Sequence, residues 1–172
     1  MKKEKAIKNE RLYIAYGSNL NLPQMRWRCP TANVVGSGEV KDYELLFRGN
    51  RRGAVATIEP LEGNTVPVLV WNVKSEDEKS LDRYEGYPYF YRKEMMDVEL
   101  NGECVTAMVY VMNNGYEFGS PSDSYLNTIA AGYQSAGFDL DVLDKAVEKS
   151  IQLAQEQSGQ KMEPGNIWEQ GW

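Results

Sequence analysis

The sequence predicts an α+β domain built around a small barrel-like sheet. Short runs of strand-forming residues, broken by Gly and Asn, fill the middle of the chain, and a helical pattern of apolar residues follows Pro121. The chain has 172 residues, of which 42% are hydrophobic, so it can bury one core. We therefore expect residues 1–172 to form a single domain, with a short basic leader over residues 1–10 and a polar tail over residues 158–172.

The first element is a strand that runs into a loop and then a helix. Leu12–Tyr16 is apolar and rich in strand formers, and Gly17-Ser18-Asn19 favours a turn. Asn21 can cap a helix that has Pro23 in its first turn and ends at Pro30. This order leaves backbone N–H groups of the turn free to face an anion.

The next elements are short strands, which predict a mixed or antiparallel sheet. Their runs are Ala32–Val35, Tyr43–Phe47, Ala54–Ile58 and Val66–Trp71.

A short helix is expected over Ser75–Tyr84. Ser75 and Glu78 match a capping box at its start, and Gly86 followed by Pro88 ends it. Glu85 therefore becomes the last helical residue.

Two strands and then helices complete the pattern. The runs Tyr89–Leu100 and Cys104–Met112 flank Asn101-Gly102, a strong hairpin-turn signal. Beyond Pro121, apolar residues recur at helical spacing. They are Tyr125, Ile129 and Tyr133, followed by Leu140, Leu143, Val147 and Ile151.

Composition excludes several classes of function. The net charge of -6 argues against a nucleic-acid partner, because phosphate binding needs clustered Lys and Arg. No apolar run reaches the roughly 18 residues of a membrane span and no signal segment is visible, so we expect a cytoplasmic protein with no membrane partner. The absence of His excludes Ser-His and Cys-His nucleophilic pairs, and Cys29 and Cys104 show no metal-binding spacing.

Four motifs occur in the order found in γ-glutamylcyclotransferases, and the sequence resembles that family from about Leu12 to Val147. The resemblance implies a mixed barrel of about six to seven strands with flanking helices, and a cavity at one end. The motifs are Tyr13-Ile14-Ala15-Tyr16-Gly17-Ser18-Asn19-Leu20, Leu81-Asp82-x-x-Glu85-Gly86, Tyr110-Val111-Met112 and Pro121-Ser122-x-x-Tyr125.

The resemblance also implies an activity and a set of site residues. Members of the family convert a γ-glutamyl amide to 5-oxoproline and a free amine without a cofactor or metal. Glu85 matches the acid-base glutamate of the family. The matching substrate-binding residues are Tyr16, Gly17, Ser18, Asn19 and Leu20 in the loop, and Tyr91, Tyr110 and Tyr125 in the pocket wall.

The residues themselves suit this chemistry but leave alternatives open. Glu85 lies among aromatic residues that can raise its pKa, and one carboxyl group can both remove and return a proton. A Glu before Gly is ordinarily a surface residue, and a Tyr-Gly-Ser-Asn segment is ordinarily only a turn. The leaving amine is either an amino acid or another amine, a binding module without turnover is the alternative function, and the oligomeric state is open.

Overall fold

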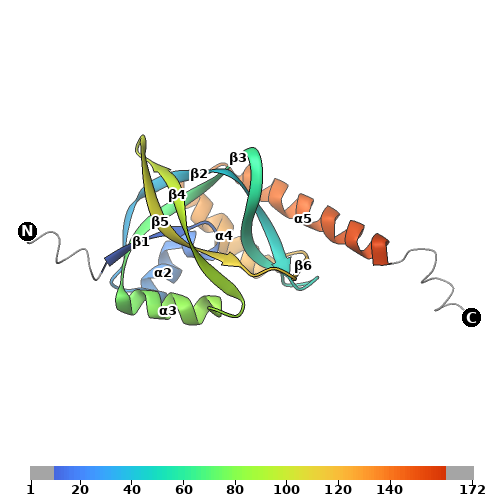
Figure 1. The fold of residues 1–172 in the computed structure, drawn as a ribbon, viewed down its shortest axis with the longest axis horizontal. Helices are drawn as coiled ribbons and strands as arrows, with labels where there is room; N and C mark the ends of the chain where they lie inside the picture. Colours follow the sequence, from blue (N-terminus) through green and yellow to red (C-terminus); the bar gives the residue numbers. More distant parts are fainter. Residues whose placement is uncertain (1–9, 162–172) are drawn as a thin grey trace, which may run out of the picture.

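The computed structural model of the protein describes residues 10–161. Within these residues, six strands and five helical segments follow one another (Figure 1). The strands are β1 (Glu10–Ala15), β2 (Asn33–Gly49), β3 (Val55–Lys74), β4 (Tyr91–Leu100), β5 (Glu103–Met112) and β6 (Glu117–Phe118). The helical segments are η1 (Ser18–Leu20), α2 (Leu22–Arg28), α3 (Ser75–Glu85), α4 (Asp123–Ala136) and α5 (Leu140–Lys161).

The two predicted end segments fall mostly outside this range. Residues 1–9 of the leader and 162–172 of the tail lie outside the described residues. Residue 10, assigned to the leader, begins β1, and α5 continues to Lys161. The division into leader, domain and polar tail stays a prediction.

The strands form a nearly closed mixed barrel. Their order is β3-β1-β5-β4-β2-β6, and β2 also pairs with β3, so the first five strands return on themselves. Only β1 and β5 run parallel among the paired strands of the described chain. The contact between β2 and β4 is short, with the pairs Gly38–Leu100 and Glu39–Glu99. The predicted α+β barrel with flanking helices is confirmed.

The predicted number of strands in the middle of the chain was wrong. Four expected runs merge into two long strands, β2 and β3, which pair from Asn33–Asn72 to Arg48–Val55 with bulges near Val34 and Lys41. The polar middle segments of β2 and β3 lie opposite one another. Both stay extended because each provides backbone hydrogen-bond partners for the other. Pairing across the ladder therefore outweighs local β propensity.

Helix α3 ends as predicted but begins with a different cap. Gly86 adopts φ 67°, the left-handed conformation that closes a helix, so Glu85 is the last helical residue. At the start, the Asp77 carboxylate accepts the Lys74 N–H at 3.0 Å, one position earlier than the expected Ser75–Glu78 box. Glu78 is thereby free to pair with Lys93, at 2.7 Å.

The other local signals are confirmed. Asn21 caps α2 by accepting the Gln24 N–H at 3.1 Å. Ser122, for which no cap was predicted, caps α4 in the same way. Asn101 and Gly102 both have positive φ, as their tight hairpin between β4 and β5 requires.

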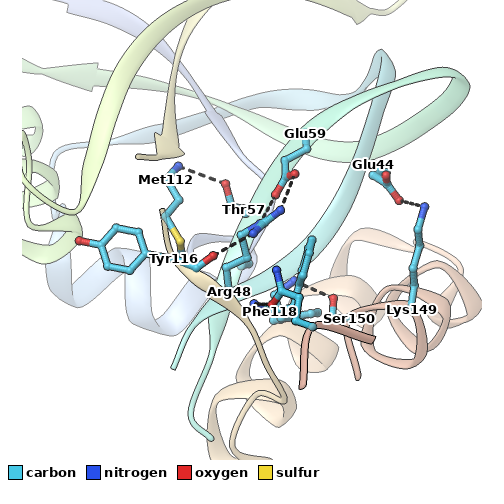
Figure 2. Close-up of polar contacts among 12 residues, drawn as sticks. Glu44, Arg48, Thr57, Glu59, Met112, Tyr116, Phe118, Lys149 and Ser150 are labelled. Atoms are coloured by element: carbon cyan, nitrogen blue, oxygen red, sulfur yellow. Dashed lines mark hydrogen bonds and ion pairs between the residues drawn. The ribbon is translucent and has the colours of Figure 1, made fainter. Parts of the chain in front are cut away.

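Helix α5 lies along β2 and extends past the barrel (Figure 1). Two contacts attach it to β2. Ser150 Oγ accepts the Phe47 N–H at 2.9 Å, and Lys149 Nζ contacts Glu44 at 2.6 Å (Figure 2). In the same region Arg48 of β2 pairs with Glu59 of β3, at 2.5 Å. No helix among the described residues is long and apolar enough to cross a membrane.

Helix α4 packs directly on η1, the turn that follows β1. A Cβ atom at Gly132 would lie 2.6–2.8 Å from the Cβ and backbone of Leu20, so only glycine permits this approach. Leu20, Ile129 and Tyr133 are completely buried at the contact. The conformation of the turn is therefore supported by a helix more than 100 residues later in the sequence.

Candidate active site

A cavity of about 340 Å³ opens where β1 ends and α3 stops. It brings together eight of the nine residues predicted for the site. These are Glu85, Tyr16, Gly17, Ser18, Asn19, Tyr91, Tyr110 and Tyr125. Leu20 does not line the cavity, because its side chain is completely buried beneath α4.

Glu85 faces this cavity from the last turn of α3. It is half-buried, and no hydrogen bond to its carboxyl group is formed within residues 10–161. Desolvation raises the pKa of Glu85 to about 7, and the nearby positive charge of Arg28 acts in the opposite direction. A carboxyl group with this pKa exchanges protons readily near neutral pH.

The tyrosine hydroxyl groups in the cavity wall differ in whether they donate or accept hydrogen bonds within the protein. Tyr16 donates to the Tyr110 carbonyl at 2.6 Å, Tyr91 donates to the Ala56 carbonyl at 2.5 Å, and the Tyr110 hydroxyl donates to Asp82 Oδ1 at 2.5 Å. Tyr125 instead accepts the Ala56 N–H at 3.0 Å, and its hydroxyl group also interacts with the Ser18 side chain. Burial raises the pKa of Tyr125, so it remains a donor.

The loop lines the cavity, and its polar side chains are bonded to other protein groups. Ser18 Oγ lies 2.7 Å from the Tyr84 hydroxyl, and Asn19 Nδ2 donates to the Tyr13 hydroxyl at 2.8 Å. The N–H of Leu20 donates to the Gly17 carbonyl at 3.0 Å. We therefore remove Leu20 from the expected donors, whereas no protein acceptor within the described chain engages the N–H groups of Gly17, Ser18 and Asn19.

A polar network holds α3 against the sheet behind the cavity. Lys93 Nζ contacts Glu78 at 2.7 Å and Asp82 at 2.9 Å, and Asp82 also accepts the Tyr110 hydroxyl. The network links one face of α3 to β4 and β5, so it positions Glu85 at the end of the helix. Sequence reasoning placed Asp82 in a motif but gave it no role, and Lys93 carried no signal.

Arg28 was also missed, and Tyr84 was expected only as one of the aromatic residues around Glu85. The Arg28 guanidinium carbon lies 3.4 Å from the centre of the Tyr84 ring, and its Nη1 donates to Asn19 Oδ1. These residues come from α2 and α3, more than 50 positions apart. No local pattern could have predicted their contact.

The described residues include no cluster of three or more His, Cys, Asp or Glu side chains that could hold a metal ion. Within the cavity wall, Glu85 supplies a carboxyl group for proton transfer, and tyrosine hydroxyl groups and the backbone of the loop surround it.

Comparison with known proteins assigns the chain to a family. The family model described as "Gamma-glutamyl cyclotransferase, AIG2-like" matches residues 13–132, which include Glu85 and all the lining tyrosines. The chain belongs to this family. The resemblance inferred from the motifs is thus confirmed.

Individual γ-glutamyl cyclotransferases agree with this assignment. Human γ-glutamylcyclotransferase is 30% identical over 143 residues, which cover 78% of this chain and 76% of the human protein. A solved structure named γ-glutamyl cyclotransferase superposes with a TM-score of 0.72 at 29% identity, over 80% of this chain and 86% of the other. A yeast γ-glutamyl cyclotransferase specific to glutathione shares the fold, with a TM-score of 0.58 at 10% identity, over 85% and 97% of the two chains.

Proposed function

We propose that this protein is a cyclotransferase that converts a γ-glutamyl amide to 5-oxoproline and releases the free amine. The observation that carries the proposal is Glu85: a carboxyl group with a pKa of about 7 and no protein hydrogen bond in the described chain, facing a cavity beside unpaired backbone donors. Membership of the γ-glutamyl cyclotransferase family supports the same activity.

The reaction is an internal aminolysis. The neutral α-amino group of the glutamyl unit attacks its γ-carbonyl carbon, a C–N bond forms, and a five-membered ring closes. The attacking nitrogen loses a proton to the Glu85 carboxylate, and Glu85 returns that proton to the leaving nitrogen as the original amide bond breaks. No net proton or electron is gained, so one carboxyl group is sufficient.

The loop and Tyr125 supply the remaining functions. The free N–H groups of Gly17, Ser18 and Asn19 are suited to the substrate α-carboxylate or to the oxyanion of the tetrahedral intermediate. The Tyr125 hydroxyl, which stays protonated because burial raises its pKa, is a further donor suited to the same oxygen atoms. Because the nucleophile belongs to the substrate, much of the acceleration comes from folding the glutamyl chain into a reactive conformation.

A substrate panel tests the proposal. The protein is incubated with γ-glutamyl amino acids, γ-glutamyl amines and glutathione, with and without a chelator, and 5-oxoproline is detected by mass spectrometry. We expect product from at least one class, at a rate that the chelator does not change. Absence of product from every member, with binding retained, would instead identify a binding module without turnover. A cytoplasmic location remains part of the proposal.

A further inference from the structure

A groove adjoins the cavity on the outer side of Tyr84. It is lined by Pro23, Gln24, Trp27 and Arg28 of α2 and by Tyr84, which also forms part of the cavity wall. Arg28 connects the two spaces further, because it stacks on Tyr84 and donates to Asn19, a residue of the cavity. A substrate whose glutamyl unit fills the cavity can therefore continue over Tyr84 into the groove.

The Arg28 guanidinium is held in place without being neutralised. Stacking on Tyr84 and hydrogen bonds to Asn19 and Gln24, the latter at 3.3 Å, fix its orientation. Its other N–H donors have no partner among residues 10–161, and no carboxylate there forms an ion pair with it. A planar guanidinium with fixed orientation and open donors is suited to binding a carboxylate.

The surroundings favour the same type of ligand. Arg83 lines the cavity together with Tyr84 and likewise has no ion pair within the described chain, so a second cation lies close to the groove. Trp27 is 90% exposed and faces the groove. An indole in this position offers a flat apolar surface that a ligand side chain can cover.

We propose that this groove is the binding site for the leaving group, and that Arg28 selects leaving amines that carry a carboxylate. Trp27 covers the apolar part of the same leaving group. The inference rests on the proposed cyclotransferase function and specifies its substrate class. Cationic leaving groups, such as polyamines, are disfavoured because they would bring a like charge to Arg28 and Arg83.

Two substrates that differ only in the critical group test this inference. γ-Glutamylphenylalanine and γ-glutamylphenethylamine have the same aromatic leaving group, with and without the carboxylate. We expect wild-type kcat/KM for 5-oxoproline formation to be about tenfold or more higher for the phenylalanine substrate, the effect of one charge-assisted contact. Arg28→Gln is expected to bring this ratio close to one.

Matched variants separate recognition from structural support. Arg26 lies on the same helix, is exposed and lines neither space, so Arg26→Gln should preserve the ratio. If Arg28 only supports Asn19, Arg28→Gln will lower both rates equally and preserve the ratio, which overturns the proposal. Trp27→Ala should lower kcat/KM for both substrates, and unchanged rates for both would exclude the groove.

The failure of the two proposals can be distinguished. If 5-oxoproline forms but wild type shows no preference for the carboxylate, the subsite assignment is wrong and the function stands. If no 5-oxoproline forms, the proposed function is wrong, and calorimetry with the same two compounds still decides the subsite. Tighter binding of γ-glutamylphenylalanine that is lost in Arg28→Gln supports it, and equal affinities overturn it.

Discussion

Glu85 acquires its properties from its place at the end of a helix that faces a cavity. Its carboxyl group is desolvated and has no hydrogen bond in the described structure. Burial without a partner is costly for a charged carboxylate, so the pKa rises. The same physical effect that reduces the stability of the ionised protein makes the group suitable for proton transfer.

Replacement of Glu85 by Gln should abolish turnover and preserve the fold. The amide has nearly the same shape but cannot exchange a proton, and we expect kcat to fall by about 10²–10⁴-fold. Product formation is measured by mass spectrometry, and circular dichroism checks the fold. Retention of more than about a tenth of the wild-type rate would exclude Glu85 as the proton shuttle.

The raised pKa of Glu85 also predicts two pH effects with opposite signs. Activity should fall as the pH drops below about 7, because the protonated carboxyl cannot accept a proton. Stability should change in the other direction: the folded pKa lies above the unfolded one, so the contribution of Glu85 is complete below the unfolded pKa and is lost as the pH rises through about 7.

Chemical denaturation of wild type and Glu85→Gln at about pH 5 and about pH 8 measures the stability effect. The variant should gain stability relative to wild type at the higher pH. If the unfolding free energies of wild type and Glu85→Gln differ by the same amount at both pH values, the pKa of Glu85 is not raised.

Substitutions at Gly17 and Ser18 test whether the backbone of the loop or its side chains contribute more to ligand binding. A Cβ atom at Gly17 would lie 3.1 Å from Ala56 Cβ, so Gly17→Val should displace the loop and severely weaken binding of 5-oxoproline. Ser18→Ala removes one hydroxyl group, with its contacts to Tyr84 and Tyr125, and should cost about 0.5–1.5 kcal/mol. Calorimetric dissociation constants compare the two variants, and equally small effects would mean that the turn does not bind the ligand.

At the scale of the elements, the site depends on packing between segments far apart in sequence. Helix α4 supports η1, and the Lys93 network supports α3. The two halves of the candidate site, loop and glutamate, are thus positioned independently. Disrupting either the packing of α4 on η1 or the Lys93 network on α3 should lower catalytic activity, although neither change removes a group that contacts substrate.

Gly132→Ala tests the support of η1 by α4. The added methyl group would overlap the Leu20 backbone, so the helix must move, and we expect a loss of about 1–3 kcal/mol in stability together with a lower kcat/KM. Gly159→Ala is the matched control, because nothing lies within 4 Å of its added Cβ in α5. Thermal unfolding and steady-state kinetics are measured for both. Equal behaviour of the two variants would contradict close packing at Gly132.

At the scale of the whole molecule, the barrel depends on a short closing contact. β2 and β4 share only two residue pairs, and the Cβ of a residue replacing Gly38 would lie 2.4 Å from the Glu99 carbonyl oxygen. Glycine is therefore required for close backbone approach rather than for an unusual φ.

Gly38→Ala should separate β2 from β4 and lower the melting temperature, with a cost of about 1–3 kcal/mol. The exposed neighbour Ser37 provides a control, since Ser37→Ala should change stability by less than about 0.5 kcal/mol. Hydrogen exchange of the Gly38 and Glu39 backbone amides reports on closure. Unchanged protection and stability in Gly38→Ala would show that this contact does not maintain the barrel.

The sequence by itself determined the local features of this protein. The strand before Gly17, the Asn21 cap, the Asn101-Gly102 hairpin and the end of α3 at Gly86 all depend on residues a few positions apart. Backbone conformational preferences and capping groups act over that range, so a single sequence reveals them. Family motifs added the site residues, and eight of these nine line one cavity.

Only the tertiary structure decided how these pieces combine. The merging of four predicted runs into β2 and β3, the exclusion of Leu20 from the cavity and the stacking of Arg28 on Tyr84 depend on contacts between distant segments. The contact of the Tyr125 hydroxyl in α4 with the Ala56 N–H in β3 is likewise a contact between distant segments. Local preferences cannot specify such pairings, because they follow from which surfaces bury one another and which donors meet acceptors across the fold.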